Sequence, residues 1–270
     1  VLAQIAAEAL GAALADVRVV IGDTERTPYT GNSWGSMTTA SAGPAVRMAA
    51  EDARRSLLAA AAQIMGTAPH VILEARDSVV RAAGGGAELT FAKIADALGD
   101  VMILGRGSRG PNPERTAIMT FGVQFAEVEV DPGTGVVRVV RIVAAHDAGR
   151  IINPTLAESQ LEGGIIQGLG YALFEERVLD RSSGVPLNPT MHDYKIPTMR
   201  DTPFIDAFFV PSSDTVANHT GARGLAEPPI IPTAPAIANA VADALGVEVR
   251  EIPMTPWRVL ARREGRGTRD

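Results

Sequence analysis

The sequence contains no cysteine, and this absence excludes several kinds of chemistry at once. Without thiols the chain forms no disulfide, carries no iron–sulfur cluster of its own and offers no thiolate ligand to a metal. Aromatic residues are also scarce at 4%, whereas 27 glycines and 18 prolines lie between apolar segments. Small residues let backbone approach other backbone or a ligand closely, and the turn formers indicate many irregular connections.

Excess positive charge and long apolar runs are lacking as well. The net charge is −6 over 270 residues, so no overall positive field attracts nucleic acid or an anionic membrane. No apolar run reaches the ~20 residues that cross a bilayer, and the first residues lack the pattern of a signal peptide. We therefore expect a cytoplasmic chain that works on a small-molecule substrate. The densest basic group is interpreted as a solvated tail and comprises Arg258, Arg262, Arg263, Arg266 and Arg269.

Common local motifs for phosphate or metal binding are missing. There is no G-x-x-x-x-G-K-[ST] loop and no H-E-x-x-H helix, and Gly168-Leu-Gly170 is only a fragment of a dinucleotide fingerprint. The histidines are too dispersed for a sequence-local metal site and are expected to be structural or surface residues: His70, His146, His192 and His219.

Hydrophobic periodicity predicts helices interleaved with strands, which is typical of a mixed α+β fold. Helices are expected over residues 1–14, 46–65, 90–98, 153–176 and 232–245. Strands are expected over residues 17–21, as a pair within 71–83, and over 121–130, 136–145 and 248–252. The clearest local feature is the hairpin at 121–145, because Asp131-Pro-Gly-Thr-Gly135 has the chemistry of a turn.

Glu227 lies between small residues and a Pro-Pro pair. Pro228 disfavours the α region for the residue before it, so the Glu227 carboxylate is presented from a constrained, non-helical backbone. Among small apolar neighbours we expect this carboxylate to lose solvation, which suits it to proton transfer near neutral pH. The same features also fit a helix-capping or surface glutamate.

Gln167 lies in a predicted helix that is unusually rich in glycine: Gly163, Gly164, Gly168 and Gly170. Each glycine costs about 1 kcal/mol against alanine in a helix interior. Close packing or close approach of a ligand would account for so many. The Gln167 amide can donate to and accept from an oxo or phosphate group, although a helix-surface glutamine is the alternative.

Three hydroxyl residues, Thr38, Thr39 and Ser41, gather just before the predicted 46–65 helix. Hydroxyls together with the free N–H groups of a helix N-terminus bind anionic groups readily. A helix cap within a polar loop is the alternative interpretation.

These features occur together in one known pattern. From about Asp23 to Trp257 the chain resembles the C-terminal half of the molybdopterin-binding subunit of the xanthine dehydrogenase/aldehyde oxidase family. Five stretches carry the resemblance in order and spacing: Thr30-Gly-Asn-Ser-Trp-Gly-Ser-Met-Thr-Thr-Ala-Ser41, Asp147-Ala-Gly-Arg-Ile-Ile-Asn-Pro154, Gln160-Leu-Glu-Gly-Gly-Ile-Ile-Gln-Gly-Leu-Gly170, Tyr194-Lys-Ile-Pro197 and Gly221–Pro229. It implies a second molybdopterin-binding domain over residues 1–270, with 1–120 and 121–270 as candidate subdomains.

The resemblance also implies roles for particular residues. Glu227 matches the catalytic glutamate, a general base at the molybdenum centre, and Gln167 matches the glutamine that contacts the cofactor near the metal. The hydroxyl group of Thr38, Thr39 and Ser41 matches the segment that holds the pterin and its phosphates. Arg223 matches a basic position four residues before the glutamate, where it could tune the charge of that carboxylate. Thr38 is bulkier than the glycine or alanine that the family often has there.

Much of the family's machinery has no counterpart in this chain. The family's Gly-x-Gly-Gln-Gly loop, first molybdopterin domain, iron–sulfur domain and flavin domain are absent. We therefore expect a molybdenum cofactor, in the cytosine dinucleotide form, shared with another molybdopterin-binding chain, with 2Fe-2S and FAD carried by iron–sulfur and flavin partners or domains. The implied activity is hydroxylation of an N-heterocycle or aldehyde carbon with water as oxygen source. The alternative is a non-catalytic structural or assembly subunit of such a complex.

Overall fold

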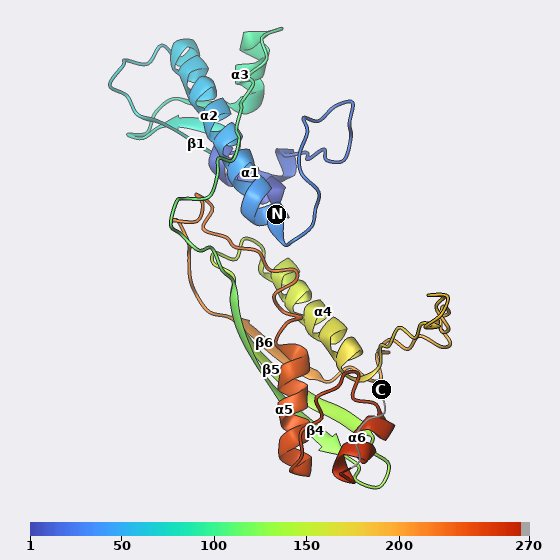
Figure 1. Ribbon diagram of the computed structural model, residues 1–270. Coiled ribbons are helices and arrows are strands. Elements are labelled where there is room, and N and C mark those ends of the chain that lie inside the picture. Colours follow the sequence, from blue (N-terminus) through green and yellow to red (C-terminus); the bar gives the residue numbers. More distant parts are fainter. Residues whose placement is uncertain (266–270) are drawn as a thin grey trace. The chain divides into compact units, whose positions relative to one another are not determined.

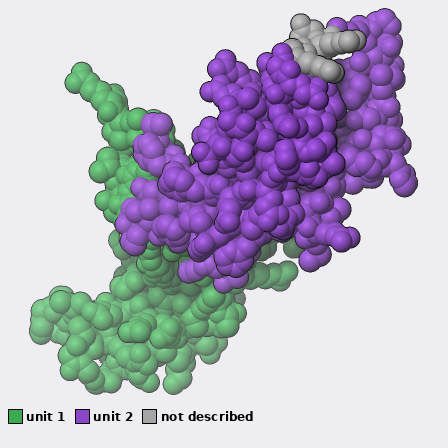
Figure 2. Space-filling model, turned by 90° about the horizontal axis from the view of Figure 1, so that it is seen from below, with its two compact units in different colours: residues 1–118, 149–153, 213–224 green, residues 119–148, 154–212, 225–270 purple. Residues whose placement is uncertain are grey.

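The computed structural model describes residues 1–265 and divides into two compact units (Figure 2). Unit 1 consists of residues 1–118, 149–153 and 213–224, and unit 2 of residues 119–148, 154–212 and 225–270. The chain therefore passes between the units more than once. Both units contain helices and strands, which confirms the expected mixed α+β class.

Unit 1 is built on one long helix that packs with two shorter helices and a small sheet (Figure 1). Its elements are α1 (Leu2–Leu10), β1 (Leu73–Arg76), β2 (Val79–Ala82), β3 (Glu88–Thr90), α2 (Gly43–Met65) and α3 (Phe91–Leu98). The three strands are antiparallel in the order β1-β2-β3. The core of unit 1 lies between the helices and this sheet, and its buried side chains are Leu57 and Ala61 of α2, Ala75 of β1, Val80 of β2 and Ile94 of α3.

Gly11 explains why the first helix is shorter than the predicted 1–14. It has a positive φ of 84°, which ends α1 in the left-handed conformation that glycine adopts without strain. A Cβ at this position would also lie 2.2 Å from the carbonyl oxygen of Ala75. A separate short turn of 3-10 helix follows at Leu14–Asp16.

Unit 2 is a three-stranded sheet with helices packed on one face (Figure 1). Its elements are β4 (Phe121–Val130), β5 (Val137–Asp147), α4 (Pro154–Leu173), β6 (Phe204–Phe209), α5 (Thr233–Leu245) and α6 (Pro256–Arg263). The central strand β5 pairs antiparallel with β4 and parallel with β6. Ile142 and Ala144 of β5 are fully buried in a core with Leu161, Ile165, Leu169, Ile237, Val241, Met254 and Val259.

The hairpin, the strand pair at 71–83 and the later helices are confirmed, but two predicted strands are wrong. Residues 17–21 and 248–252 form neither helix nor strand. A strand needs a neighbour to pair with, and Ile21 is instead 71% exposed. Val249 is buried, so the apolar pattern there reflects packing against the unit 2 core rather than sheet pairing.

The solvated-tail interpretation of the C-terminal arginines is also wrong for its first member. Arg258 lies on α6, its side chain is only 13% exposed, and its guanidinium is 2.7 Å from Glu176 Oε1. Arg262 pairs with Glu251 at 3.3 Å. Arg266 and Arg269 lie outside the described residues.

Within residues 1–265, none of the helices combines the length and the apolar character needed to span a bilayer.

The glycines of α4 have different surroundings. A Cβ on Gly164 would lie 2.7 Å from Pro229 Cβ, and one on Gly168 would lie 2.5 Å from Thr233 Cβ. These two glycines allow the chain around Pro229 and the first turn of α5 to lie directly on the α4 backbone. Gly163 is different, because nothing lies within 4 Å of its Cβ position.

This contrast predicts opposite effects of two neighbouring substitutions on thermal stability. We expect Gly163→Ala to stabilise the chain by up to ~1 kcal/mol, since alanine favours the helix and meets no neighbour. Gly164→Ala should instead lower the Tm, because displacing Pro229 carries an overpacking cost of about 1–3 kcal/mol. Calorimetric melting of both variants checks this, and equal Tm values would contradict the described packing.

Candidate functional site

Glu227 lies in a tight turn that leads from the end of the Gly221–Pro229 segment into α5. Its backbone carbonyl accepts a hydrogen bond from the N–H of Ile230 at 3.0 Å, and Ile230 in turn accepts from the N–H of Thr233 at 3.3 Å. The Glu227 side chain is exposed, whereas Pro229 is buried. Glu227 is thus an exposed residue on a turn whose next residues are buried or hydrogen-bonded.

The expected loss of solvation at Glu227 is not found in this chain. Its neighbour Ala226 is exposed as well, and Gly224 has no side chain. Small residues are too short to cover a carboxylate, which is why the sequence argument fails here. Within unit 2 the residues next to Glu227 therefore do not desolvate it.

Three buried polar side chains form hydrogen bonds to the backbone of this turn and to one another. The amide nitrogen of Gln124, on β4, donates to the carbonyl oxygen of Pro229 at 2.7 Å. The hydroxyl of Thr233, at the start of α5, lies 2.7 Å from Gln124 Oε1 and 3.1 Å from the same carbonyl. His146 Nε2, on β5, is 3.4 Å from the Gln124 amide nitrogen. We call Gln124, His146 and Thr233 the buried triad.

The buried triad has little access to water. His146 and Thr233 are 0% exposed and Gln124 is 7% exposed. Burial lowers the pKa of His146 below its ordinary value of 6.5, so the ring is neutral. Gly122 makes room for it, because a Cβ there would lie 2.1 Å from the ring. His146 was expected to be structural, whereas Gln124 and Thr233 carried no sequence signal beyond being polar residues at the start or middle of an element.

Gln167 is exposed on α4, on the same side as Gly163 one turn earlier. Nothing lies within 4 Å of the Cβ position of Gly163, so this flank of the helix is open at that point, and we call it the bare flank of α4. The adjoining flank of α4 contacts Pro229 and Thr233 through Gly164 and Gly168. The structure thus brings the segment of Glu227 and the helix of Gln167 together in unit 2. An exposed amide on a bare helix face suits close approach of a flat, polar cofactor.

Thr38, Thr39 and Ser41 lie in unit 1, in a turn of π-helix at Thr38–Ala42 that runs directly into α2. Thr38 is exposed, and Thr39 and Ser41 are half-buried. π-Helical turns are rare and frequently occur at functional sites. The preceding Ser36 has a positive φ of 57°, and Gly224 packs on it closely enough that a Cβ would lie 2.8 Å from the Ser36 carbonyl oxygen.

Arg223 lies in a tightly bonded loop of unit 1. Its side chain is 9% exposed and its Nε is 3.8 Å from Asp214 Oδ2. The Asn218 amide braces this loop by donating to the carbonyl of Ala222 at 2.8 Å and accepting from the N–H of Thr220 at 3.0 Å. Asn218 therefore has a structural role, and Arg223 is a fixed rather than a mobile charge.

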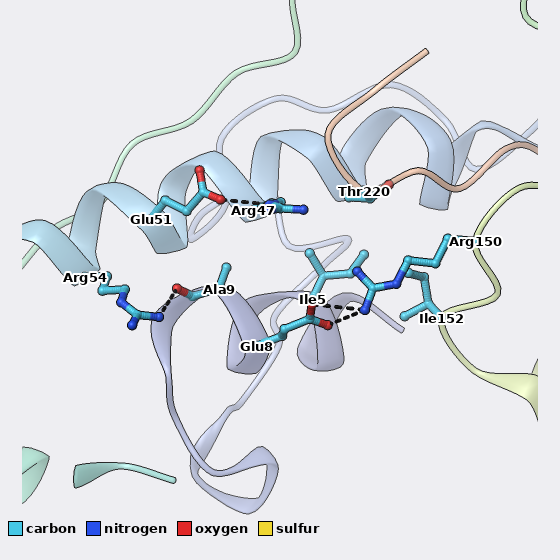
Figure 3. A pocket seen from close by; sticks show the side chains of 9 residues that line it. All are labelled: Ile5, Glu8, Ala9, Arg47, Glu51, Arg54, Arg150, Ile152 and Thr220. Atoms are coloured by element: carbon cyan, nitrogen blue, oxygen red, sulfur yellow. Dashed lines mark hydrogen bonds and ion pairs between the residues drawn. The ribbon is translucent and has the colours of Figure 1, made fainter. Parts of the chain in front are cut away.

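Unit 1 also contains a cavity of about 310 Å³ beside this loop (Figure 3). Most of its charged lining is paired, because Arg47 bonds Glu51 at 2.8 Å and Arg150 bonds Glu8 at 2.8 Å, while Arg54 donates to the carbonyl of Ala9 at 3.4 Å. Among the described residues, its lining includes none of the six candidates named from the sequence. Over residues 1–265, no cluster of three or more histidine, cysteine, aspartate or glutamate side chains is placed to hold a metal ion.

Comparison with known proteins identifies the class of domain. The family model of the molybdopterin cofactor-binding domain matches residues 1–203, so this chain belongs to that family. It is the domain found in the large subunit of xanthine dehydrogenase and aldehyde oxidoreductase enzymes.

Several relatives match nearly the whole chain. The chain is 35% identical to the xanthine dehydrogenase molybdenum-binding subunit of Escherichia coli O157:H7, covering 96% of this chain and 35% of that protein. It is 34% identical to the 6-hydroxypseudooxynicotine dehydrogenase complex subunit gamma of Paenarthrobacter nicotinovorans, covering 98% and 34%. The crystal structure of quinoline 2-oxidoreductase from Pseudomonas putida 86 matches with a TM-score of 0.85 at 29% identity, covering 98% and 35%. The chain thus spans about a third of the length of these relatives.

The burial of His146 predicts a pH dependence of stability. Because the pKa of His146 is lowered in the folded chain, the unfolded chain binds a proton more readily once the pH falls below 6.5. The free energy of unfolding should therefore fall as the pH drops through that value. Urea denaturation at a series of pH values measures the slope, which should be shallower in His146→Gln and unchanged in the exposed control His70→Gln. An unchanged slope in His146→Gln would contradict this assignment.

Proposed function

We propose that this chain is the part of a molybdenum hydroxylase large subunit that supplies the general base, Glu227, and one side of the pterin site. The observation that carries the proposal is the presentation of Glu227. Glu227 is an exposed residue, while the turn beneath it is anchored by a buried hydrogen bond to the Pro229 carbonyl. A base has to be accessible and also held in place, because proton transfer depends on a fixed geometry.

The remaining candidates have surroundings that suit the same cofactor. Gln167 would contact the cofactor near the metal from the bare flank of α4. The hydroxyls of Thr38, Thr39 and Ser41 would bind the pterin and its phosphates, aided by backbone N–H groups where the helical run begins. Arg223 would add a fixed positive charge, held in place beside Asp214.

The chemistry follows from what each group can do. The molybdenum cofactor, when bound, accepts two electrons from the substrate. Overall, a substrate C–H and one water give a C–OH, two electrons and two protons. Glu227 would accept one of these protons as the oxygen derived from water attacks the carbon. Closure of the site by other domains would remove water from Glu227 and strengthen it as a base.

The names of the relatives suggest the class of substrate. They include dehydrogenases or oxidoreductases of xanthine and quinoline, and an aldehyde oxidoreductase molybdenum-binding subunit in Escherichia coli. We therefore propose an electron-poor carbon of an N-heterocycle or an aldehyde as the target.

The partners follow from the part of the relatives that this chain does not match. One relative is named as a subunit of a dehydrogenase complex. We propose that another molybdopterin-binding chain or segment completes the site, that the cofactor is a cytosine dinucleotide, and that iron–sulfur and flavin partners carry 2Fe-2S and FAD for electron removal.

Glu227→Gln tests the proposal directly. In the complete enzyme this substitution keeps the size of the side chain and removes its ability to accept a proton. We expect molybdenum and pterin contents to stay normal while kcat falls by at least about 10²-fold, the lower range for loss of a general base. Steady-state kinetics together with metal analysis measures both quantities.

Glu74→Gln, an exposed glutamate on β1, is the matched control and should leave kcat unchanged. Near-normal turnover of Glu227→Gln would overturn the catalytic assignment. A complete enzyme that holds no molybdenum, with its partners present, would favour a structural or assembly role instead.

A further inference from the structure

We propose that the buried triad of Gln124, His146 and Thr233 is a positioning device for Glu227. This inference rests on the proposed function of that carboxylate. It goes further by assigning a role to three residues that lie buried in unit 2, behind the turn that carries Glu227. They act on the reaction only by holding the backbone from which Glu227 projects.

The first step is the connection between the triad and the turn. Pro229 follows Glu227 by two residues, and its carbonyl oxygen receives the Gln124 amide at 2.7 Å. The Thr233 hydroxyl lies within 3.1 Å of that oxygen and within 2.7 Å of Gln124 Oε1. The carbonyl is thus bonded to the sheet through Gln124 of β4, and the Thr233 hydroxyl in the first turn of α5 holds the Gln124 amide in turn.

The second step is that the Gln124 amide has one orientation. Its oxygen accepts from Thr233, so its nitrogen has to face the Pro229 carbonyl and His146 Nε2. The same amide nitrogen lies 3.4 Å from His146 Nε2, so the ring closes off the remaining side of the amide. Because all three side chains are buried, water does not offer competing partners and the network holds its members in one arrangement.

The third step is that the turn has few other ways to move. Tyr171, on α4, donates its hydroxyl to the carbonyl of Ile230 at 3.0 Å, one residue beyond Pro229. Gly164 and Gly168 bring the α4 backbone against Pro229 and Thr233, where a single added Cβ would already be too close. Packing limits movement toward α4, and the buried triad limits movement away from it.

Thr233→Val tests the inference in the complete enzyme, because valine keeps the shape of threonine and removes only the hydroxyl. We expect kcat to fall about tenfold, since a small displacement of a catalytic group is enough for a loss of that order. KM and molybdenum content should stay within about twofold of wild type. Thr233→Ser restores the hydroxyl and should recover most of kcat.

Thr255→Val is the matched control in the same unit. Its Oγ1 is buried but has no hydrogen-bond partner among the described residues, so its loss should leave kcat unchanged. Tyr171→Phe is a second, milder variant that removes the bond to Ile230 and should lower kcat without lowering molybdenum content.

The double variant separates positioning of Glu227 from a general effect on the fold. With Glu227→Gln already present, Thr233→Val should cause no further loss in single-turnover reduction by substrate. A further tenfold loss there, or a Thr233→Val kcat equal to that of Thr255→Val, would overturn this inference alone. Loss of molybdenum in step with activity, or no recovery in Thr233→Ser, would also overturn it. Near-normal turnover of Glu227→Gln would instead overturn the proposed function, and this inference with it.

Discussion

The carbonyl oxygen of Pro229 is the point on which the organisation of unit 2 depends. It joins three elements that are far apart in sequence, because β4 supplies Gln124, α5 supplies Thr233, and α4 leaves room for the proline at Gly164. A buried carbonyl left without a donor would be unfavourable by about 1–3 kcal/mol. The hydrogen bond from Gln124 satisfies it and so ties the segment just before α5 to the sheet.

Local patterns in the sequence were sufficient for part of this fold. The β4–β5 hairpin could be predicted because its turn residues and its alternation are adjacent in the chain. The strand β6 could not, since it pairs in parallel with β5 across a long connection and its register joins Arg141 to Phe204. The reverse error occurred at residues 17–21, where β-branched residues indicated a strand but the described fold supplies no neighbour.

The candidate site, too, has features that the sequence predicts and features that only the folded structure reveals. The resemblance to a family selected Glu227 and Gln167 as candidates, and the comparisons establish the family membership of the domain. Physical reasoning from neighbouring residues failed for the solvation of Glu227, because small neighbours could not cover it. For the glycine-rich helix the sequence left close packing and close approach of a ligand open, and only the three-dimensional arrangement distinguishes Gly164, which meets Pro229, from Gly163, which faces open space. Gln124 could not be found at all, since one amide in a strand has no characteristic spacing.

The Pro228-Pro229 pair has a further consequence for a segment that must stay accessible. Neither residue has an N–H group, so two consecutive positions next to Glu227 are unable to donate a hydrogen bond to a passing extended chain. Natural proteins use proline in this way to prevent exposed backbone from adding strands of other molecules. The exposed turn that carries Glu227 is for this reason a poor template for strand addition.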